Sequence, residues 1–328
     1  MKIRDLKILS VLLICLLALG VLVGCGQSTP PAEEQVPVEN TEPVEQPQEA
    51  PAESESGTLS DAVMAYFANM PSDIYKIPEK DFIEKVKAGE DMFILDIRQL
   101  DVYNQGHVKG AVNVPWGPNF ADCLDLLPAD KPVMVYCYTG QTAGQAVMLL
   151  NLAGFTARSV NLGWDRGISK VEGVEAVSET TANDFGEVTP LDIDAGIKDA
   201  ITAYCQGLAD VKDTPYANYK INEDDAKKLF DEKDPGVAFV SVRSVDDFAA
   251  GHIEGAINIP WGQGMEQQFN ILPKDKKLIV YCYTGQTAGQ TVAALRLLGY
   301  DAVSLNSGMG TPATGDTGWQ NKGYPVVQ

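Results

Sequence analysis

Apolar residues in this chain form short runs that are separated by amphipathic stretches. Runs of mostly apolar residues predict buried strands, and in the first half they lie at 92–97, 111–114 and 132–135. A further strand is predicted at 157–160. Apolar residues at helical spacing predict helices at 60–70 and 78–88, and a third helix around 146–150. Strands that alternate with helices favour the α/β class, with an open, mostly parallel sheet flanked by helices.

The same pattern returns in the second half. Its predicted strands are 237–242, 256–259, 277–280 and 302–305, and its predicted helices are 194–208, 222–231 and 292–298. Residues Tyr136–Gln145 recur letter for letter as Tyr281–Gln290. Such self-similarity at domain length indicates duplication, because solenoid repeats have periods of about 20–50 residues. We therefore predict two α/β domains, at 58–178 and 191–328, joined by a polar linker at 179–190.

The N-terminal residues have the composition of a targeting segment. Three basic residues precede an apolar run at 8–23. Residues 22–25 resemble the bacterial lipobox, so we expect a lipoprotein-type signal peptide at 1–24 and a lipid on Cys25. An uncleaved membrane anchor is the alternative. In both cases the rest of the chain lies outside the cytoplasm, at the bacterial cell membrane, behind an acidic, Pro- and Glu-rich tether at 25–57.

The charge of the chain limits its partners. The formal net charge is −20, from 45 acidic and 25 basic side chains. That charge argues against nucleic acid or an anionic membrane surface as an electrostatic partner, so the lipid is the expected link to the membrane. The chain has only two histidines, His107 and His252, which makes a His-rich metal site hard to build. We expect neither a metal nor a cofactor.

Cys137 and Cys282 occupy equivalent places in the two halves. Each follows a predicted strand and precedes a small, polar, Gly-containing loop that leads into a predicted helix. Main-chain N–H groups converge in such a loop, and the helix dipole adds positive potential there. This environment stabilises a thiolate, which is the nucleophilic form of cysteine. A buried structural cysteine is the alternative.

Two motifs, each present twice, resemble the signatures of rhodanese domains. Residues 96–98 and 106–115 resemble the D-x-R…G-H-I-x-G-A-x-N-I-P signature, and residues 242–260 resemble it again. Downstream, Tyr-Cys-x-x-Gly-x-x-Ala at both cysteines resembles the active-site loop of the family. The resemblance covers most of 72–178 and 216–328, and it implies two rhodanese-like domains.

The resemblance implies a sulfurtransferase. Its cysteine would take sulfane sulfur from a small donor (thiosulfate, a polysulfide or an organic persulfide), become a persulfide, and pass the sulfur to a thiol or cyanide acceptor. The implied catalytic residues are Cys137 and Cys282. The implied substrate-binding loops are Tyr138, Thr139, Gly140, Gln141, Thr142 and Ala143 in the first half, and Tyr283, Thr284, Gly285, Gln286, Thr287 and Ala288 in the second.

Three other functions are alternatives to sulfur transfer. Related phosphatases have a longer loop than the six residues 137–142, and neither loop has the arginine that would clamp a phosphoryl group. A phosphatase is therefore disfavoured. Two alternatives stay open. One is a non-catalytic sulfur carrier or sensor, and the other is a thiol-redox protein whose two loop cysteines oxidise together.

The loops depart from the family in their charge. Thiosulfate-using members commonly have Arg or Lys in the loop, whereas every loop side chain here is neutral. We therefore expect thiosulfate to bind weakly, and a polysulfide or an organic persulfide to be at least as good a donor. Since both halves keep the cysteine, we expect two competent sites.

Four polar residues that both motifs share are expected to have structural roles. Arg98 and Arg243 are predicted to hold a strand end to a carboxylate, such as Asp96 in the first half. The second half has Ser241 in place of that Asp. His107 and His252 follow glycine in a tight turn and are predicted to be hydrogen-bonded structural residues.

Two further pairs are left with open roles. Trp116 and Trp261 either wall the sulfur site or cover the core. Cys123 and Cys205 have no counterpart in the other half and are interpreted as small hydrophobic residues. A disulfide between them is the alternative in an exported protein.

Overall fold

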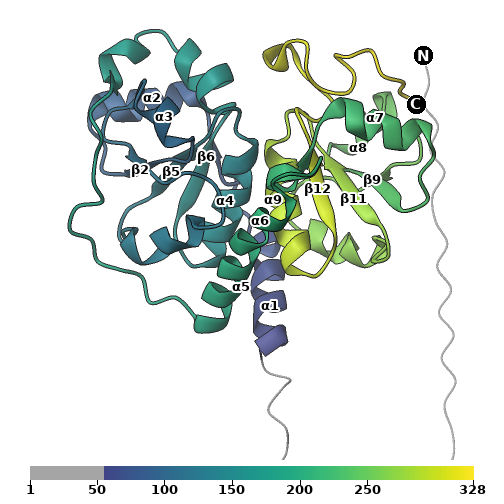
Figure 1. Cartoon of the computed structure of the whole chain (residues 1–328), viewed down its shortest axis with the longest axis horizontal. Helices are drawn as coiled ribbons and strands as arrows, with labels where there is room; N and C mark the ends of the chain where they lie inside the picture. The colour runs from purple at the N-terminus through teal and green to yellow at the C-terminus, as the bar shows by residue number, and fades with distance from the viewer. Residues whose placement is uncertain (1–54) are drawn as a thin grey trace, which may run out of the picture. The chain divides into compact units, whose positions relative to one another are not determined.

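The computed structural model describes residues 55–328, which belong to one compact unit (Figure 1). The predicted signal peptide, Cys25 and residues 25–54 of the predicted tether lie outside the described residues. Helix α1 (Glu55–Ala68) begins inside the range predicted as tether. Within residues 55–328, no helix is both long and apolar enough to cross a membrane.

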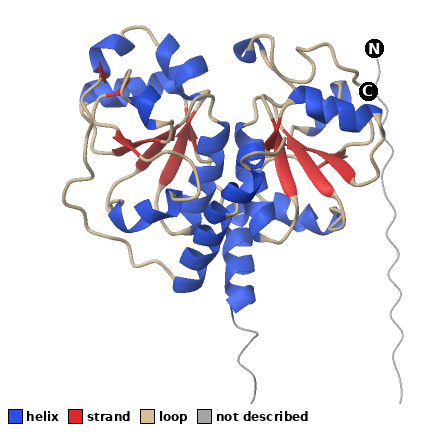
Figure 2. Cartoon of the chain, viewed as in Figure 1, coloured by secondary structure: helices blue, strands red, loops and turns tan. Residues whose placement is uncertain are grey.

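Each half contains a five-stranded parallel sheet with helices around it (Figure 2). The first sheet has the order β1-β6-β5-β2-β4, and the second has the same order in its own numbering, β8-β12-β11-β9-β10. The predicted α/β class is therefore confirmed. The strands of the first sheet are β1 (Lys76–Ile77), β2 (Phe93–Asp96), β4 (Val112–Asn113), β5 (Val133–Tyr136) and β6 (Ala157–Val160). Those of the second are β8 (Lys220–Ile221), β9 (Val237–Ser241), β10 (Ile257–Asn258), β11 (Lys277–Tyr281) and β12 (Ala302–Leu305).

After α1, the helices are α2 (Glu79–Ala88), α3 (Leu100–Tyr103), α4 (Gln141–Leu152), α5 (Ala195–Gln206), α6 (Leu208–Val211), α7 (Glu223–Asp231), α8 (Val245–Ala250) and α9 (Gln286–Leu297). Helices α2, α5 and α7 agree with the predicted ranges to within two residues, whereas α1, α4 and α9 begin five or six residues earlier than predicted. The short helices α3, α6 and α8 were not predicted. Short 3₁₀ segments η1 (Phe120–Leu126) and η6 (Met265–Ile271) precede the cysteine strands. An antiparallel pair, β3 (His107–Val108) with β7 (Ser178–Glu179), lies outside the first sheet. The edge strands β1 and β8 were not predicted, because two residues show no periodicity.

The alternation of side chains along the central strand decides where the first cysteine lies. Val133 and Val135 of β5 pack in the core cluster that contains α4, whereas Met134 and Tyr136 pack with α2 on the opposite face. Successive side chains of a strand point to opposite faces. Cys137 continues the alternation and joins the α4 cluster. Cys282, after β11, is placed in the same cluster in the same way.

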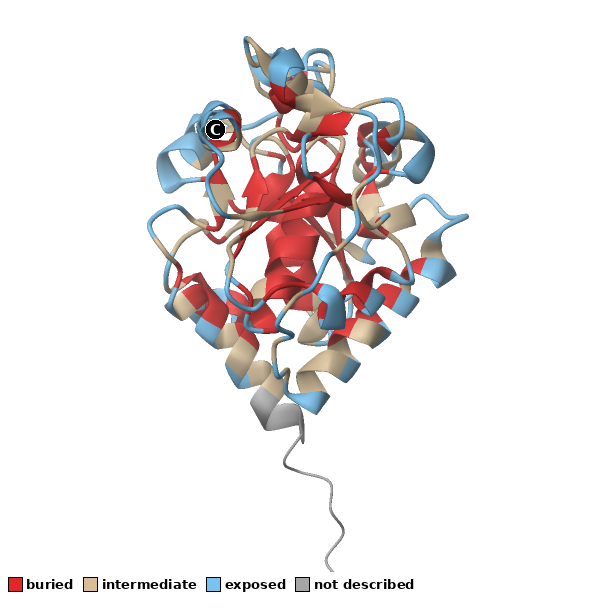
Figure 3. Ribbon diagram, turned by 90° about the vertical axis from the view of Figure 1, so that its left-hand side faces the viewer, coloured by how far each residue is buried: buried red, intermediate tan, exposed pale blue. Residues whose placement is uncertain are grey.

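Helices α4 and α9 lie against each other between the two sheets (Figure 1). Every residue of α4 except Asn151 is buried, and so are residues 286–295 of α9. Figure 3 shows buried residues concentrated in the centre of the molecule and exposed ones on the outer helices and loops. A helix that is apolar on all sides is a buried helix. The two halves therefore share one hydrophobic core.

The first helix of each half packs on the other half. Phe67 of α1 meets Phe269 of η6, with ring centroids 5.3 Å apart. Tyr204 of α5 meets Trp116 next to η1, and its hydroxyl donates to Gln145 Oε1 of α4 over 2.7 Å. Each half thus completes the core of the other.

The crossing of α4 and α9 generates a stability prediction. A Cβ on Gly144 would overlap the main-chain oxygen of Gln286, and a Cβ on Gly289 would overlap that of Gln141. We expect Gly144→Ala to lower the free energy of unfolding by about 2 kcal/mol in urea denaturation, because overpacking forces the helices apart. Gly262→Ala is the control, since nothing lies within 4 Å of its Cβ position. Equal midpoints for the two variants would contradict the tight crossing.

Candidate active site

Each cysteine stands directly after a central strand, four residues before an α-helix. Strand β5 ends at Tyr136 and α4 begins at Gln141. The chain reverses at Gly140, the N-cap of α4, with φ 88°. Glycine adopts this left-handed conformation without the steric cost of a Cβ. Gly285 does the same before α9, with φ 93°.

Two main-chain N–H groups donate to the sulfur in the first loop, and one does so in the second. In the first loop, the N–H groups of Gly140 and Ala143 donate to Cys137 Sγ over 3.2 and 3.4 Å. In the second loop, the N–H of Gly285 donates to Cys282 Sγ over 3.1 Å. Both cysteines are only 2% exposed. Although buried, neither thiol is surrounded by aliphatic groups alone, and a negative sulfur would be stabilised at both positions.

A second loop, not anticipated from the sequence, supports each cysteine from behind. The N–H of Trp164 donates to the carbonyl of Cys137, and the N–H of Met309 donates to that of Cys282, both over 2.8 Å. The preceding residues, Gly163 and Gly308, allow this approach, because a Cβ there would overlap the cysteine carbonyl. The sequence signal was present: Asn-x-Gly occurs at 161–163 and again at 306–308.

The second cysteine loop borders a cavity of about 590 Å³. Residues of both halves line it. Those from the predicted loop are Cys282, Tyr283, Thr284, Gln286 and Thr287. Trp261, Leu162 and Asn161 belong to the remaining wall. The cavity is large enough for a small sulfur compound.

The glutamine of each loop reaches across to the other half. Gln141 Nε2 donates to Ser304 Oγ over 2.6 Å. Gln286 Nε2 donates in the same way to Ser159 Oγ over 2.7 Å. These side chains, predicted only as parts of substrate-binding loops, therefore join each loop to the sheet of the other half.

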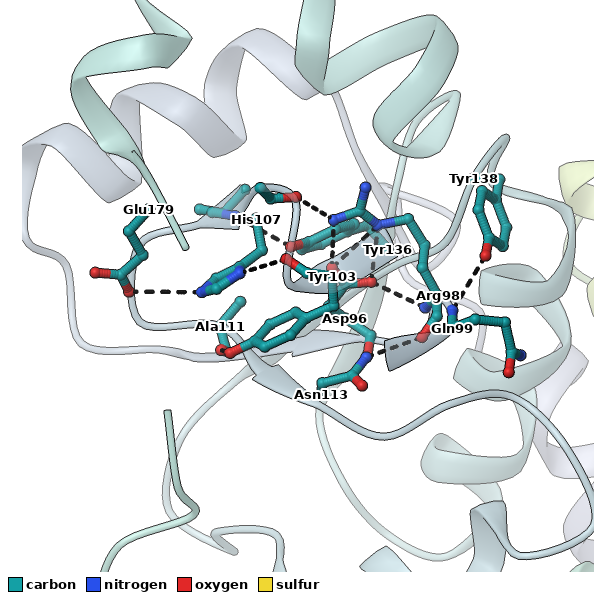
Figure 4. Close-up of polar contacts among 12 residues, drawn as sticks. Asp96, Arg98, Gln99, Tyr103, His107, Ala111, Asn113, Tyr136, Tyr138 and Glu179 are labelled. Atoms are coloured by element: carbon teal, nitrogen blue, oxygen red, sulfur yellow. Dashed lines mark hydrogen bonds and ion pairs between the residues drawn. The ribbon is translucent and has the colours of Figure 1, made fainter. Parts of the chain in front are cut away.

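Asp96 and Arg98 form a buried ion pair in the first half (Figure 4). Arg98 Nη2 lies 2.6 Å from Asp96 Oδ2 and also donates to the carbonyl of Gly106 over 2.7 Å. The guanidinium lies 4.4 Å from the ring centre of Trp164, the residue bonded to the Cys137 carbonyl. The pair thus anchors the strand end and the supporting loop together.

The expectation of a carboxylate partner is wrong for Arg243. Its Nη2 donates to the carbonyls of Asp247 and Gly251, and no ion pair of Arg243 exists within residues 55–328. The reason is Ser241, which has no carboxylate and whose hydroxyl accepts from the N–H of Arg243. Arg243 is held by main-chain oxygens instead.

Both histidines bond to main-chain carbonyls. His107 Nδ1 lies 2.8 Å from Tyr103 O, and its Nε2 lies 3.1 Å from Thr181 O. His252 Nδ1 lies 2.9 Å from Phe248 O. His107 is 0% exposed, and His252 is not among the residues that line the cavity.

The tryptophans belong to both the core and the site. Trp261 lines the cavity at Cys282 and also packs edge-on against Phe67 of α1, with ring centroids 5.6 Å apart. Trp116 is 6% exposed and packs on Phe120. Among the described residues, no hydrogen-bond acceptor is found for the buried Nε1 of either indole. Within the described residues, neither indole N–H is therefore used in a hydrogen bond that stabilises the fold.

Cys123 and Cys205 are both free thiols in the described part of the chain, as are Cys137 and Cys282. Burial raises the pKa of Cys123 to about 12, and burial raises the pKa of Cys205 to about 12 as well. Within residues 55–328, no cluster of three or more His, Cys, Asp or Glu side chains is placed to hold a metal ion.

These environments predict selective alkylation. At pH 8, iodoacetamide should modify Cys137 and Cys282 in the folded protein and leave Cys123 and Cys205 unmodified, because a thiol of pKa about 12 is almost entirely protonated there. Peptide mass spectrometry measures each site, and denaturation in urea should expose all four. Fast modification of Cys123 in the folded protein would contradict this picture.

Comparison with known proteins assigns both halves to one family. The family model "Rhodanese-like domain" matches residues 79–170 and 222–310, more than half of the chain and both cysteine loops. The "Putative sulfur carrier protein YrkF" of Bacillus subtilis is 29% identical over 84 residues, which are 26% of this chain and 45% of that protein, so less than half of that relative is matched. The "Putative thiosulfate sulfurtransferase SseB" of Mycobacterium tuberculosis is 28% identical over 264 residues, covering 66% of this chain and 86% of that protein.

Among solved structures, the 3-mercaptopyruvate sulfurtransferase from Leishmania major is 19% identical, with a TM-score of 0.35, and covers 72% of this chain and 74% of that one. The family match and the relative named as a putative thiosulfate sulfurtransferase support sulfurtransferase activity in general terms. The chain belongs to the rhodanese family and has two rhodanese-like domains in tandem.

Proposed function

We propose that this protein is a rhodanese-type sulfurtransferase that carries sulfane sulfur as persulfides on Cys137 and Cys282. The observation that carries the proposal is the set of loop N–H groups that donate to each sulfur. The donor is a small sulfur compound, and the acceptor is a thiol or cyanide. No cofactor takes part.

The proposed reaction has two displacement steps. With thiosulfate as donor, the cysteine thiolate attacks the outer sulfur, a new S–S bond forms, and sulfite leaves with the electron pair of the broken S–S bond. Cyanide then attacks the terminal sulfur of the persulfide, thiocyanate leaves, and the thiolate is regenerated. Negative charge stays on sulfur throughout, so the loop amides stabilise every state without a proton shuttle.

The cysteine loops generate the activity prediction. We expect Cys137→Ser and Cys282→Ser each to remove the turnover of one site, and the double variant to fall to the uncatalysed rate, because the nucleophile is lost. Thiocyanate formation should be measured with thiosulfate, polysulfide and glutathione persulfide as donors. Full activity of the double variant would overturn the assignment.

A sulfur carrier without turnover is the second candidate, favoured by the match to a protein named as a sulfur carrier. The two functions differ in the fate of the sulfur after it has been loaded. A carrier keeps one added sulfur on Cys137 or Cys282 in the mass spectrum and forms no thiocyanate with any donor. A sulfurtransferase loses the added sulfur to cyanide and repeats the cycle.

The proposed location is the outer side of the bacterial cell membrane, with a lipid on Cys25. We expect Cys25→Ala to move the full chain from the membrane fraction to the soluble fraction of expressing cells, because the lipid is then lost. Cys15→Ala is the matched control, because this cysteine lies inside the predicted signal peptide. Membrane retention of Cys25→Ala would instead support an uncleaved anchor.

A further inference from the structure

Each edge strand next to the junction of the two halves carries a lysine. Lys76 is on β1 and Lys220 is on β8. The two belong to a repeated sequence, Tyr-Lys-Ile, at 75–77 and 219–221. Both side chains are half-buried. Within residues 55–328, neither ammonium group has an ion pair or a hydrogen-bond acceptor.

Strand register places each lysine on the face that meets the other half. Lys76 pairs with Ser159 in the parallel sheet, and register partners of neighbouring strands point to the same face. Ser159 Oγ accepts from Gln286 Nε2, a residue of the Cys282 loop. Lys76 therefore lies on the side of its sheet that contacts the Cys282 loop.

The relation is reciprocal. Lys220 pairs with Ser304, and Ser304 Oγ accepts from Gln141 Nε2 of the Cys137 loop. Lys220 therefore lies on the side of the second sheet that contacts the Cys137 loop. Both halves have an equivalent lysine, serine and glutamine with the same strand register, so the arrangement is a property of the repeat.

The cavity at Cys282 confirms the placement for Lys76, which is one of its lining residues. Burial lowers the pKa of Lys76, and the charge interaction with Cys282 opposes that effect. Burial also lowers the pKa of Lys220, and Cys137 opposes it. By strand register, each lysine thus lies on the side of its sheet that contacts the cysteine loop of the other half.

A second kind of donor at the same cavity also lacks an acceptor. Trp261 lines the cavity, and for its buried Nε1 no acceptor is found within the described residues. The equivalent Nε1 of Trp116 in the first half is also buried and has no acceptor within the described residues. An N–H donor and an ammonium group near one thiol suit an anionic ligand.

We propose that each cysteine site takes its positive charge from the other half of the chain. Lys76 serves Cys282, and Lys220 serves Cys137. Both sites then accept anionic sulfur donors, such as thiosulfate or a persulfide anion, although every loop side chain is neutral. The assignment of the donor class rests on the proposed function, whereas the charge at each thiol does not.

At the Cys282 site, Lys76 offsets two sources of negative charge that would repel an anionic donor. The chain has a net charge of −20, which repels anions. Glu79 is the other charged residue that lines the cavity at Cys282. A half-buried ammonium next to the thiol acts over a short distance in a poorly screened site, where one charge changes a rate constant severalfold.

Paired alkylating reagents test the charge at each thiol without requiring sulfur transfer. Iodoacetate is an anion and iodoacetamide is its neutral analogue, so the ratio of their rates at one cysteine reports the local potential. In the full-length protein, Lys76→Gln should lower this ratio about fivefold at Cys282 while Cys137 of the same molecule serves as the internal reference. Lys220→Gln should show the opposite selectivity, lowering the ratio at Cys137.

Three further variants define the outcome. Lys76→Arg should restore the ratio at Cys282, Glu79→Gln should raise it, and Lys80→Gln, an exposed lysine on α2, controls for net charge. Unmodified Cys123 and Cys205 show that each variant is folded. An unchanged ratio at Cys282 in Lys76→Gln, or equal changes at both cysteines, would overturn the proposal.

The same variants separate this proposal from the proposed function. In a Cys137→Ser background, Lys76→Gln should raise the KM for thiosulfate severalfold, because the lysine binds the donor anion. If no donor loads sulfur on either cysteine while the alkylation ratios shift as expected, the charge assignment holds and the sulfurtransferase function fails. If sulfur transfer proceeds and the alkylation ratios do not shift, the sulfurtransferase function holds and the charge assignment fails.

Discussion

Helices α4 and α9 cross where each has a glycine, and the main-chain oxygen of one helix lies where the other would carry a Cβ. This contact fixes the distance between the two cysteine loops, because each loop leads directly into one of the helices. It also lets Gln141 and Gln286 reach the sheet of the opposite half. A larger residue at either glycine would separate the helices and change both sites together.

The two contributions to each site come from different parts of the chain. Main-chain amides come from the loop itself and are fixed by the strand–loop–helix geometry. The half-buried lysine comes from the edge strand of the other half. The loop N–H groups give each buried sulfur hydrogen bonds, which lower the cost of burying a thiolate, but they carry no net charge. The joining of two halves then adds the charge that one domain lacks.

The two halves keep the same cysteine loop but hold their arginines differently. Arg98 is neutralised by Asp96, whereas Arg243 is surrounded by main-chain oxygens and Ser241. In both halves the arginine Nη2 donates to the glycine carbonyl before the histidine, at Gly106 and at Gly251. This shared hydrogen bond keeps the strand end in place, which explains how the second half retains the same loop without the carboxylate.

The sequence by itself determined the α/β class, the duplication and the position of both cysteines at strand ends, because periodicity and repeated motifs are local properties of the chain. It also indicated the loop amides, since a glycine before a helix N-terminus defines that geometry. It contained no sign that α1 and α5 pack on the opposite halves, nor that two-residue strands carry Lys76 and Lys220. Those features depend on contacts between residues far apart in the chain. Only the tertiary structure decided which lysine faces which cysteine, because the packing of α4 on α9 brings the two sheets together.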